Sequence, residues 1–358
     1  MPRARKPSLM DVAREAGVSI ATVSRALSQP DLLRADTLER VRAVASRLGY
    51  RPDRAARALA SGRSNTIGVV IPTLNSPIFA DSLQEMQRTL SDAGYQLLVA
   101  SHEYDPAAEF AAVDRLLAHG IDGLVLVGGT RPDATWQLVV SSGVPVVQMW
   151  CGHPDYACVG VDNRRAGRLV ASHLLSLGHQ RIAVITGPLR HNDRQRERLQ
   201  GIKQALGEAG LALSAGCHTE QPLSVPGGRL GCSILLELAD RPTAIIGTVD
   251  VIAIGAIVEC RARGLPVPQQ MSVAGIDNIE LSAHVAPSLT TVDIPSMKIG
   301  SEAAHRVLAL TTGTASRDHV LLPIELVERY STARPSSPSG DADRRNRADD
   351  GRTDRSKH

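Results

Sequence analysis

Residues 8–27 read SLMDVAREAGVSIATVSRAL, and this stretch decides the fold of the N-terminal part of the chain. Its first half carries apolar residues at the i, i+3, i+4, i+7 spacing of a helix, namely Leu9, Val12, Ala13 and Ala16. Ser8 is a favourable N-cap, and Gly17 is the residue type that ends helices in the left-handed conformation. The pattern therefore predicts a helix over 9–16 that ends at a glycine turn.

Two further helices are predicted after this turn. Ser19 can cap a helix over 20–27, which would bury Val23 and Ala26. A third helix is expected over 35–48, with an apolar stripe made of Leu38, Val41, Val44, Ala45 and Leu48. Two short helices joined by a tight glycine turn form a helix-turn-helix, here in an all-α headpiece of residues 1–51.

The second helix of such a unit enters the major groove of DNA, which is wide enough for one helix. We therefore expect DNA contacts from its cap and from the exposed residues of its first turns, namely Ser19, Ile20, Ala21, Thr22, Ser24 and Arg25. Arg25 is the long bidentate donor among them and suits a guanine edge or a phosphate. A three-helix bundle that binds another protein is the alternative for the same pattern.

The charge distribution favours DNA over that alternative. The chain of 358 residues carries a net charge of only +3, but the charge is +7 over residues 1–64, −5 over 65–334 and +1 over 335–358. A basic arm on an acidic body is typical of a nucleic-acid-binding segment, although a basic N-terminus can also serve solubility alone.

The stretches DVAREAGVSIATVSRAL (11–27) and YRPDRAARALASGRSNTIGVVIP (50–72) closely resemble the LacI/GalR family of bacterial transcription regulators. The resemblance covers nearly the whole chain, and it implies that Ile20 and Ala21 are the main base-reading residues. The chain departs from the family at Arg34, where the family places a serine that caps the third helix. We therefore expect a weaker cap there and a phosphate contact from Arg34.

Residues 52–64 are expected to form a hinge helix and linker. Pro52 is suited to open a helix and Gly62 to end it, but a helix of about seven residues is not stable without a partner such as a twin helix or DNA. The resemblance implies that Ala56 and Leu59 enter the minor groove, where apolar side chains act as wedges that kink DNA.

The body, residues 65–334, alternates short apolar strands with helical patterns. Strands are expected at 67–72, 95–100, 123–127, 145–150, 158–161, 181–186, 244–248 and 272–277. Helices are expected at 77–93, 106–119, 132–142, 164–176, 194–209, 226–239 and 250–263. Continuous apolar strands between helices indicate doubly wound parallel sheets, and ligands of such folds bind beyond the carboxyl ends of the strands.

The resemblance implies that this body is a two-lobed α/β effector domain like the periplasmic sugar-binding proteins. Three crossovers between the lobes are then expected near Asp162, Val292 and Pro323. Lobe 1 would hold about 65–161 and 293–322, and lobe 2 about 162–292 and 323–334. Two late strands, 289–292 and 319–322, and a late helix, 295–311, complete the predicted lobes.

Effector contacts are expected at the strand ends between the lobes. Asp277 follows an apolar run, and its carboxylate can accept two hydroxyls. Arg198 lies at the start of a helix and can hold a carboxylate or hydroxyls. The resemblance places both at effector-contacting positions. Phe79 and Trp150 are expected to form apolar walls, with burial in the core as the alternative.

Departures from the family suggest the class of effector. Val249 stands where many members have an asparagine that touches the sugar, so Asp250 is expected either to replace that contact or to cap its helix. Trp150 stands where an aspartate is usual. Four arginines crowd one loop and helix start, namely Arg190, Arg194, Arg196 and Arg198. This setting favours anions, so a sugar acid is the leading hypothesis, with a solvated surface as the alternative for all but Arg198. The segments HEYDPAAE (102–109) and ECRARGLPVP (259–268) also resemble gluconate-responsive members.

No catalytic signature accompanies these features. The sequence has no GxGxxG after its first strand and no Walker A, GxSxG or HExxH motif, and its histidines lack ligand spacing. Its five cysteines contain no CxxC pair, which favours a reduced, cytoplasmic chain. We therefore expect no enzymatic activity, no cofactor and no metal.

The remaining segments complete the functional prediction. No signal peptide is evident, and the apolar run 243–260 contains Asp250 and is interpreted as a strand and a helix. The polar tail, 335–358, is expected to be disordered and lacks a leucine heptad, so a homodimer on a pseudo-palindromic operator is expected. The sequence thus predicts a cytoplasmic repressor controlled by a sugar or sugar acid. A regulator with a purine-like corepressor and a sugar-binding protein without a DNA role are the alternatives.

Overall fold

The computed structural model describes residues 7–28, 30–51, 62–150, 156–314 and 318–336. The chain divides into two compact units, Met1–Asn65 and Thr66–His358, which we call the headpiece and the body. The expected hinge residues Ala56 and Leu59, and nearly all of the expected disordered tail, lie outside the described residues. Within the described part of the chain, no helix is both long enough and apolar enough to cross a bilayer.

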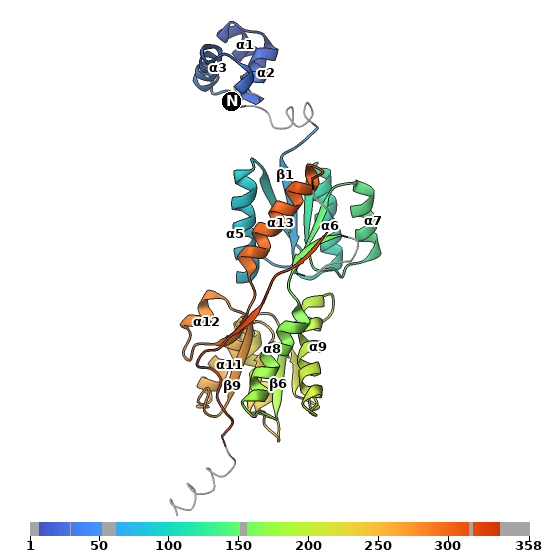
Figure 1. Cartoon of the computed structure of the whole chain (residues 1–358), viewed down its shortest axis with the longest axis vertical. Coiled ribbons are helices and arrows are strands. Elements are labelled where there is room, and N and C mark those ends of the chain that lie inside the picture. The colour runs from blue at the N-terminus through green and yellow to red at the C-terminus, as the bar shows by residue number, and fades with distance from the viewer. Residues whose placement is uncertain (1–6, 29, 52–61, 151–155, 315–317, 337–358) are drawn as a thin grey trace, which may run out of the picture. The chain divides into compact units, whose positions relative to one another are not determined.

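In its described residues the headpiece has three α-helices, α1 (Leu9–Ala16), α2 (Ile20–Ser28) and α3 (Ala35–Leu48), with a 3-10 turn at Pro30–Leu32 (Figure 1). Ser8 and Asp11 form a capping box at the start of α1, and Gly17 ends this helix with φ +65°. The hydroxyl of Ser19 accepts a hydrogen bond from the Thr22 N–H at 3.1 Å. The core holds the predicted inward residues Val12, Ala13, Ala16, Val23, Ala26, Val41, Val44 and Ala45. The predicted helix-turn-helix is therefore confirmed.

The third helix begins without a side-chain cap. Arg34 occupies its N-cap position in an extended conformation, and the Arg34 side chain makes no hydrogen bond to the first turn. This agrees with the expectation that the cap is weaker than a serine cap, because a serine hydroxyl would satisfy one of the free N–H groups there.

We expect the substitution Arg34→Ser to stabilise α3 by about 1 kcal/mol through the restored cap. Loss of a phosphate contact should also lower the salt slope of DNA binding by about 1. Hydrogen exchange of the α3 amides in the full chain measures the first effect, and DNA binding at several salt concentrations measures the second. Arg34→Ala is the matched control, which should show the weaker DNA binding without slower exchange. Equal exchange in both variants would contradict the capping argument.

The described part of the body contains two six-stranded sheets. The first has the strand order β11-β5-β4-β3-β1-β2, with all neighbours parallel. Its strands are β1 (Thr66–Ile71), β2 (Gln96–Ser101), β3 (Gly123–Val127), β4 (Val146–Trp150), β5 (Ala157–Gly160) and β11 (His319–Leu321). Strands β3, β4 and β5 are buried along their whole length, as parallel strands covered on both faces must be.

The second sheet has the order β12-β10-β9-β8-β6-β7 and is parallel except for β12, which runs antiparallel to β10. Its strands are β6 (Ile182–Thr186), β7 (His218–Glu220), β8 (Ala244–Gly247), β9 (Ser272–Asp277), β10 (Thr290–Asp293) and β12 (Glu325–Val327). We call the two sheets with their helices lobe 1 and lobe 2, in this order.

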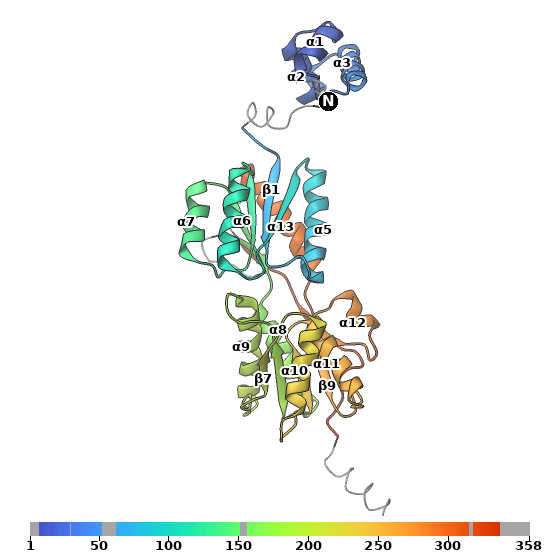
Figure 2. The same cartoon turned by 180° about the vertical axis from the view of Figure 1, so that it is seen from behind.

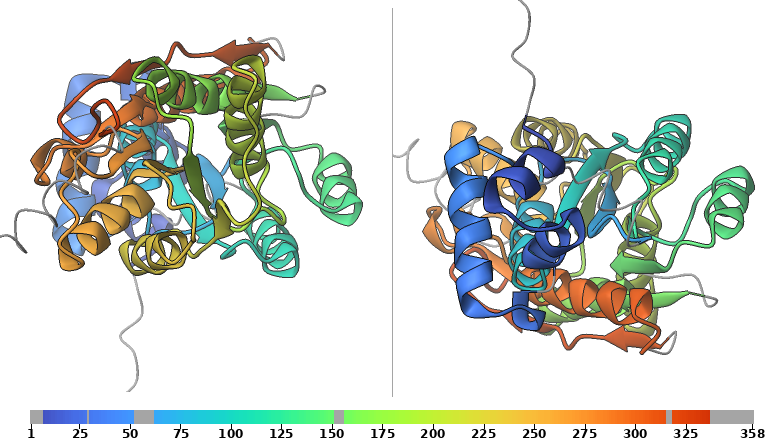
Figure 3. Two further views of the ribbon diagram at one scale, coloured as in Figure 1. Left: turned by 90° about the horizontal axis from the view of Figure 1, so that it is seen from below. Right: turned by 90° about the horizontal axis from the view of Figure 1, so that it is seen from above.

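Helices cover both faces of each sheet (Figures 1, 2 and 3). Lobe 1 carries α5 (Pro77–Asp92), α6 (Pro106–Ala118), α7 (Asp133–Ser142) and α13 (Ser296–Thr311). Lobe 2 carries α8 (Asn163–Ser176), α9 (Asp193–Glu208), α10 (Val225–Leu236), α11 (Asp250–Ala262) and α12 (Glu280–His284). The pairs α5 with α13, α8 with α9, and α10 with α11 pack against each other within their layers. The predicted fold class, a helical headpiece with doubly wound parallel sheets, is confirmed.

The chain passes between the sheets at residues 161–162, 294–295 and 322–324, beside the expected positions Asp162, Val292 and Pro323. The long elements lie within three residues of their predicted bounds. The short elements β7, α12 and β12 were not predicted.

Candidate functional site

The start of α2 is the candidate DNA-reading face of the headpiece. Its exposed residues are Ser19, Ile20, Ala21, Ser24 and Arg25. Thr22 is partly buried, and its hydroxyl pairs with that of Ser19 at 2.8 Å. Ile20 is 47 % exposed, although it is a large apolar side chain, which suits a surface that meets a partner. Arg34 is exposed as well. The described headpiece residues predicted to contact DNA are therefore accessible for that role.

A cavity lies between the two lobes of the body, at the carboxyl ends of strands from both sheets. It contains about 560 Å³ of empty space, part of which is open to solvent. The cavity is lined by Thr73, Asn75, Ser76, Pro77, Ile78, Phe79 and Tyr104 from lobe 1 and by Asn192, Arg194, Gln195, Arg198, Leu223, Val249, Val251, Asp277 and Ile279 from lobe 2. Doubly wound folds bind ligands at such strand ends, so we call this space the effector cavity.

Arg198 and Asp277 meet in the effector cavity, although they lie 79 residues apart in the chain. Nη1 of Arg198 donates to Oδ1 of Asp277 at 2.9 Å and to the Thr248 carbonyl at 2.7 Å. Nε of Arg198 donates to Oδ1 of Asn163 at 3.0 Å, and only 2 % of the arginine is exposed. Within the described part of the chain, Nη2 of Arg198 makes no hydrogen bond, so this nitrogen is available to a ligand.

Asp277 combines backbone strain with a carboxyl group that titrates near neutral pH. Its φ of +133° is rare for an L-residue, and such strain is found preferentially at functional sites. Burial raises the pKa of Asp277 to about 7, and the nearby Asp250 carboxylate acts in the same direction. The guanidinium groups of Arg198 and Arg194 oppose this rise. Asp277 can therefore act as either a neutral acid or a carboxylate at physiological pH.

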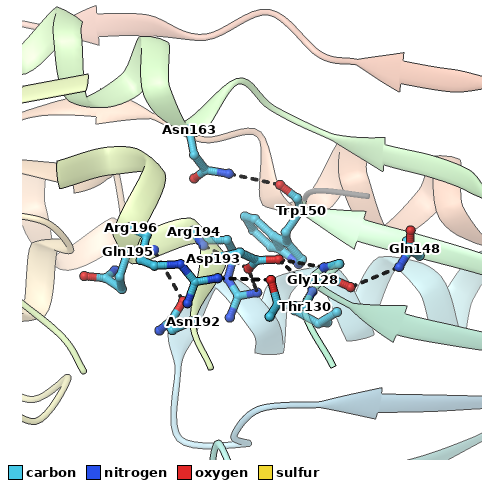
Figure 4. Close-up of polar contacts among 12 residues, drawn as sticks. Gly128, Thr130, Gln148, Trp150, Asn163, Asn192, Asp193, Arg194, Gln195 and Arg196 are labelled. Carbon is cyan, nitrogen blue, oxygen red and sulfur yellow. Dashed lines mark hydrogen bonds and ion pairs between the residues drawn. The ribbon is translucent and has the colours of Figure 1, made fainter. Parts of the chain in front are cut away.

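The predicted apolar walls, Phe79 and Trp150, lie at two different depths from the effector cavity. Phe79 lines the effector cavity, whereas Trp150 is fully buried and is not part of its lining. The two rings pack edge to face, with centroids 5.5 Å apart. Asn163 Nδ2 donates to the Trp150 carbonyl at 3.0 Å (Figure 4). The structure thus places Phe79 on the wall and Trp150 behind it, as a support in the core.

Asp250 does not line the effector cavity and is fully buried. Its carboxylate accepts hydrogen bonds from the Ile279 N–H at 3.0 Å, the Ser282 hydroxyl at 2.6 Å and the Thr291 hydroxyl at 2.5 Å. No side-chain hydrogen bond caps α11, so Asp250 does not serve as its cap either. Both roles expected from the sequence are thus disfavoured, because these internal donors satisfy Asp250, which joins α11 to the segment after β9 and to β10.

The start of α9 connects the two lobes beside the effector cavity (Figure 4). Oδ2 of Asp193 accepts hydrogen bonds from the N–H groups of Gly129 at 2.6 Å and Thr130 at 3.2 Å. Nη2 of Arg196 donates to the Thr130 hydroxyl at 3.0 Å. These bonds hold the loop after β3 against α9, so any change in the angle between the lobes must break or rearrange them.

The four arginines of this region have different environments. Arg190 is exposed, as the solvated-surface alternative expects. Arg194 is buried, lines the effector cavity and pairs with Asp193 at 3.1 Å. Arg198 lies one helical turn further along α9. Two buried guanidinium groups therefore face a cavity that also receives the positive N-terminal ends of α5, α9 and α11.

Sequence reasoning missed several lining residues, among them Asn75, Tyr104, Asn192 and Gln195. Asn75 and Tyr104 shortly follow the ends of β1 and β2, so a search just beyond the strand ends would have found them. Asn192 is the N-cap of α9 and Gln195 lies in its first turn, so these two required a search of the helix start. Among the described residues, no group of three His, Cys, Asp or Glu side chains is placed to hold a metal ion.

Comparisons with known proteins agree with the folds of the headpiece and the body. Residues 8–53 match the bacterial regulatory proteins of the lacI family, and residues 171–332 match the periplasmic binding protein-like domain. A helix-turn-helix joined to a two-lobed body with a cavity between the lobes defines a DNA-binding regulator of transcription. The chain belongs to the LacI family of bacterial regulatory proteins, whose members are regulators rather than enzymes.

Relatives and solved structures match over nearly the whole chain. The HTH-type transcriptional regulator GntR of Pseudomonas aeruginosa is 34 % identical over 335 residues, covering 91 % of this chain and 96 % of the relative. The HTH-type transcriptional regulator DegA of Bacillus subtilis is 32 % identical over 339 residues, covering 92 % and 98 %. The structure of the Lac repressor dimer bound to operator and the anti-inducer ONPF superposes with a TM-score of 0.84 at 29 % identity, covering 92 % of this chain and 100 % of that one.

Proposed function

We propose that this chain is a cytoplasmic transcriptional repressor that binds a pseudo-palindromic operator as a homodimer, and that a sugar acid bound between the lobes controls its affinity for DNA. The observation that carries the effector class is the free Nη2 of Arg198 in the effector cavity. A guanidinium nitrogen makes its strongest hydrogen bonds to an anionic oxygen, so a ligand carboxylate fits this position.

The surroundings of Arg198 support an anionic ligand. The N-terminal ends of α5, α9 and α11 line the cavity, and helix N-termini attract negative charge. Val249, which also lines it, offers no side-chain hydrogen bond to a neutral sugar. Hydroxyl groups of the same ligand can pair with the carboxyl group of Asp277. A hydroxylated acid such as gluconate can place its carboxylate at Arg198 and the helix N-termini and its hydroxyl groups at Asp277.

A dimer supplies the two headpieces that a two-half-site operator requires. The body exposes large apolar side chains that suit a subunit interface: Leu98 and Val99 on β2, Val258 on α11 and Leu281 on α12. In this proposal, residues 1–51 read the operator, 52–64 transmit the lobe movement, 65–334 bind the effector, and 335–358 have no part in DNA binding. A coupling of about 1–3 kcal/mol between effector and operator is typical of such regulators.

Selection of binding sites from random duplexes, followed by fluorescence anisotropy, tests this function. We expect a pseudo-palindromic site whose affinity changes roughly 5–150-fold with gluconate and stays unchanged with glucose or a purine. Selection of no preferred sequence would refute the DNA role. A response to glucose or a purine instead of gluconate would keep the DNA role and reject the sugar acid.

The pH dependence of effector binding gives a second readout of the same proposal. Asp277 loses its proton near pH 7, among the charged groups Arg198, Arg194 and Asp250. An ionised Asp277 repels a ligand carboxylate, so gluconate affinity should fall as the pH rises through 7. A neutral sugar, whose hydroxyls donate to the carboxylate, should bind more tightly over the same range. Isothermal titration calorimetry on either side of pH 7 distinguishes the two.

A further inference from the structure

The two lobes touch beside the effector cavity, where the loop after β3 meets the start of α9 (Figure 4). The Asp193 carboxylate of lobe 2 accepts hydrogen bonds from the N–H groups of Gly129 and Thr130 of lobe 1. Arg196 of lobe 2 donates to the Thr130 hydroxyl. We call this contact the interlobe latch. Each of its bonds joins two groups of the chain itself, so the latch needs no ligand to form.

The lobe 1 side of the interlobe latch is held in place from behind. Nη2 of Arg131 donates to the carbonyl oxygens of Val127 at 3.2 Å and Gly128 at 3.0 Å. Nε2 of Gln148 also donates to the Gly128 carbonyl, at 3.2 Å. The Arg131 side chain is fully buried, and its Nε pairs with Glu109 at 3.0 Å. With these carbonyls bound inside lobe 1, the next two N–H groups of the loop point toward lobe 2.

On the lobe 2 side, the carboxylate of Asp193 divides its two oxygens between the lobes. Oδ1 accepts from the N–H of Arg194 at 2.9 Å and from Nη1 of the same residue at 3.1 Å. Oδ2 accepts the two N–H groups of lobe 1, at 2.6 and 3.2 Å. The Asp193 side chain is only 15 % exposed, so water and salt screen these bonds weakly. An ionised acceptor forms stronger hydrogen bonds than a neutral one, so Asp193 contributes most of the strength of the latch.

Gly128 shows how closely the lobes approach each other. A Cβ added there would lie 2.7 Å from Nη1 of Arg194 and 3.1 Å from Oδ1 of Asp193. Arg194 also donates a hydrogen bond to the Tyr104 hydroxyl of lobe 1, and the side chains of these two residues line the effector cavity. The interlobe latch therefore closes one wall of that cavity.

The groups expected to bind the effector lie behind this contact. Arg198 is 2 % exposed, Asp277 6 % and Phe79 3 %, although all three line the effector cavity. A ligand of the size of a sugar acid can therefore reach them only when the lobes move apart. Because the partners of Asp193 lie on the other lobe, that movement breaks the bonds of the latch.

We propose that Asp193 holds the lobes closed through bonds of the chain alone, and that release of the interlobe latch limits how fast the effector enters and leaves the effector cavity. Weakening the latch raises the population of open bodies, so it speeds both steps. The identity of the effector rests on the proposed function. The latch itself is a property of the body, and a measurement without ligand tests it.

A thiol placed inside the effector cavity reports lobe opening in the full-length protein. Val249 lines the cavity and is 8 % exposed, so the thiol introduced by Val249→Cys should react with N-ethylmaleimide only when the lobes open. All samples also carry Cys151→Ser, which removes a competing thiol. Adding Asp193→Ala should speed the reaction about tenfold or more, because it removes two charge-assisted hydrogen bonds between the lobes. Peptide mass spectrometry measures the rate at each cysteine separately.

Native cysteines and two matched variants separate opening from unfolding. Cys158 in lobe 1 and Cys232 in lobe 2 are buried, so their labelling should stay slow in every variant. Glu197→Ala removes a carboxylate of α9 that pairs with Arg164 inside lobe 2, and it should label like the parent. Thr130→Val removes only the neutral hydroxyl of the latch and should speed the reaction about threefold.

Two labelling results would overturn the latch. One is an unchanged rate at the introduced thiol in Asp193→Ala. The other is an equal acceleration at Cys158 and Cys232, which would show that Asp193 stabilises the fold as a whole rather than the closed lobes.

Stopped-flow mixing with gluconate separates the latch from the proposed function. Asp193→Ala should speed association and dissociation of gluconate by about tenfold each. Faster labelling without gluconate binding by either protein would keep the latch and reject the sugar acid. Gluconate binding with unchanged labelling would keep the sugar acid and reject the latch. Faster labelling with unchanged gluconate rates would overturn the control of ligand entry by Asp193.

Discussion

Replacing Arg198 with alanine should abolish the response of operator binding to gluconate while leaving operator affinity in the absence of effector unchanged. The substitution removes the guanidinium nitrogen that is available to the ligand, together with the bonds to Asp277, Asn163 and the Thr248 carbonyl. Charge-assisted hydrogen bonds contribute about 1.5–3 kcal/mol each, so gluconate affinity should fall at least tenfold. Anisotropy titrations of operator DNA with and without gluconate measure both quantities.

The same variant should also be less stable, in a manner that depends on pH. Breaking a buried ion pair commonly costs about 3–5 kcal/mol. Asp277 can take up a proton instead, because burial already raises its pKa to about 7. Folding raises the pKa of this carboxyl group, so the folded state is favoured while the group is protonated. The free energy of unfolding of the variant should therefore fall as the pH rises through 7 and beyond.

Two further variants complete this test. Arg198→Lys keeps the charge but lacks the planar fork that reaches several acceptors, so it should remain folded and still respond poorly to gluconate. Arg190→Ala removes an exposed arginine shortly before the same helix and should behave like the wild type. A normal gluconate response from Arg198→Ala would show that the ligand binds elsewhere.

Replacing Gly201 with alanine should produce the largest loss of stability among single-methyl changes in α9. A Cβ at this position would lie 1.9 Å from the carbonyl oxygen of Arg164 in α8, which is backbone and cannot rotate away. Overpacking of this kind costs about 1–3 kcal/mol and sometimes more, and a clash with backbone belongs at the upper end. For a body of this size, 3 kcal/mol corresponds to a fall in Tm of roughly 6–12 °C.

Gly207 provides a control within the same helix. An added Cβ there meets nothing within 4 Å, so Gly207→Ala should be neutral or stabilise the protein by up to about 1 kcal/mol through helix propensity. Thermal unfolding followed by circular dichroism compares the two variants. Equal Tm values for Gly201→Ala and Gly207→Ala would contradict the close packing of α8 on α9.

The close packing of α8 on α9 also involves Arg198, which lines the effector cavity. A Cβ on Gly167 of α8 would lie 2.0 Å from the carbonyl oxygen of Arg198. Gly167 therefore allows the backbone of α8 to lie directly against the backbone of Arg198. The helix that carries Arg198 should therefore accommodate an added methyl group on this face only at a cost in stability.

The site was partly predictable, because some of its residues lie near strand ends or helix starts, which a sequence pattern can locate. Asp277 ends an apolar strand, and Arg198 lies in the second turn of α9, close to the helix start that the sequence predicted. Asp250 also follows a strand and yet does not line the cavity, because its carboxylate is bonded to Ser282 and Thr291. A sequence pattern cannot tell these two outcomes apart, since the difference lies in what packs on the other side of the residue.

The amino-acid sequence by itself determined the helix-turn-helix, the alternation of strands and helices, and the basic headpiece on an acidic body. Each of these depends on spacing, caps and charge within a few residues of the chain. Only the tertiary structure decided that Arg198 pairs with Asp277 and that Trp150 supports Phe79 from behind. These contacts join segments that are far apart in the sequence, because the strand ends of the two sheets meet in the body. Burial at these strand ends decides which polar groups remain available to a ligand.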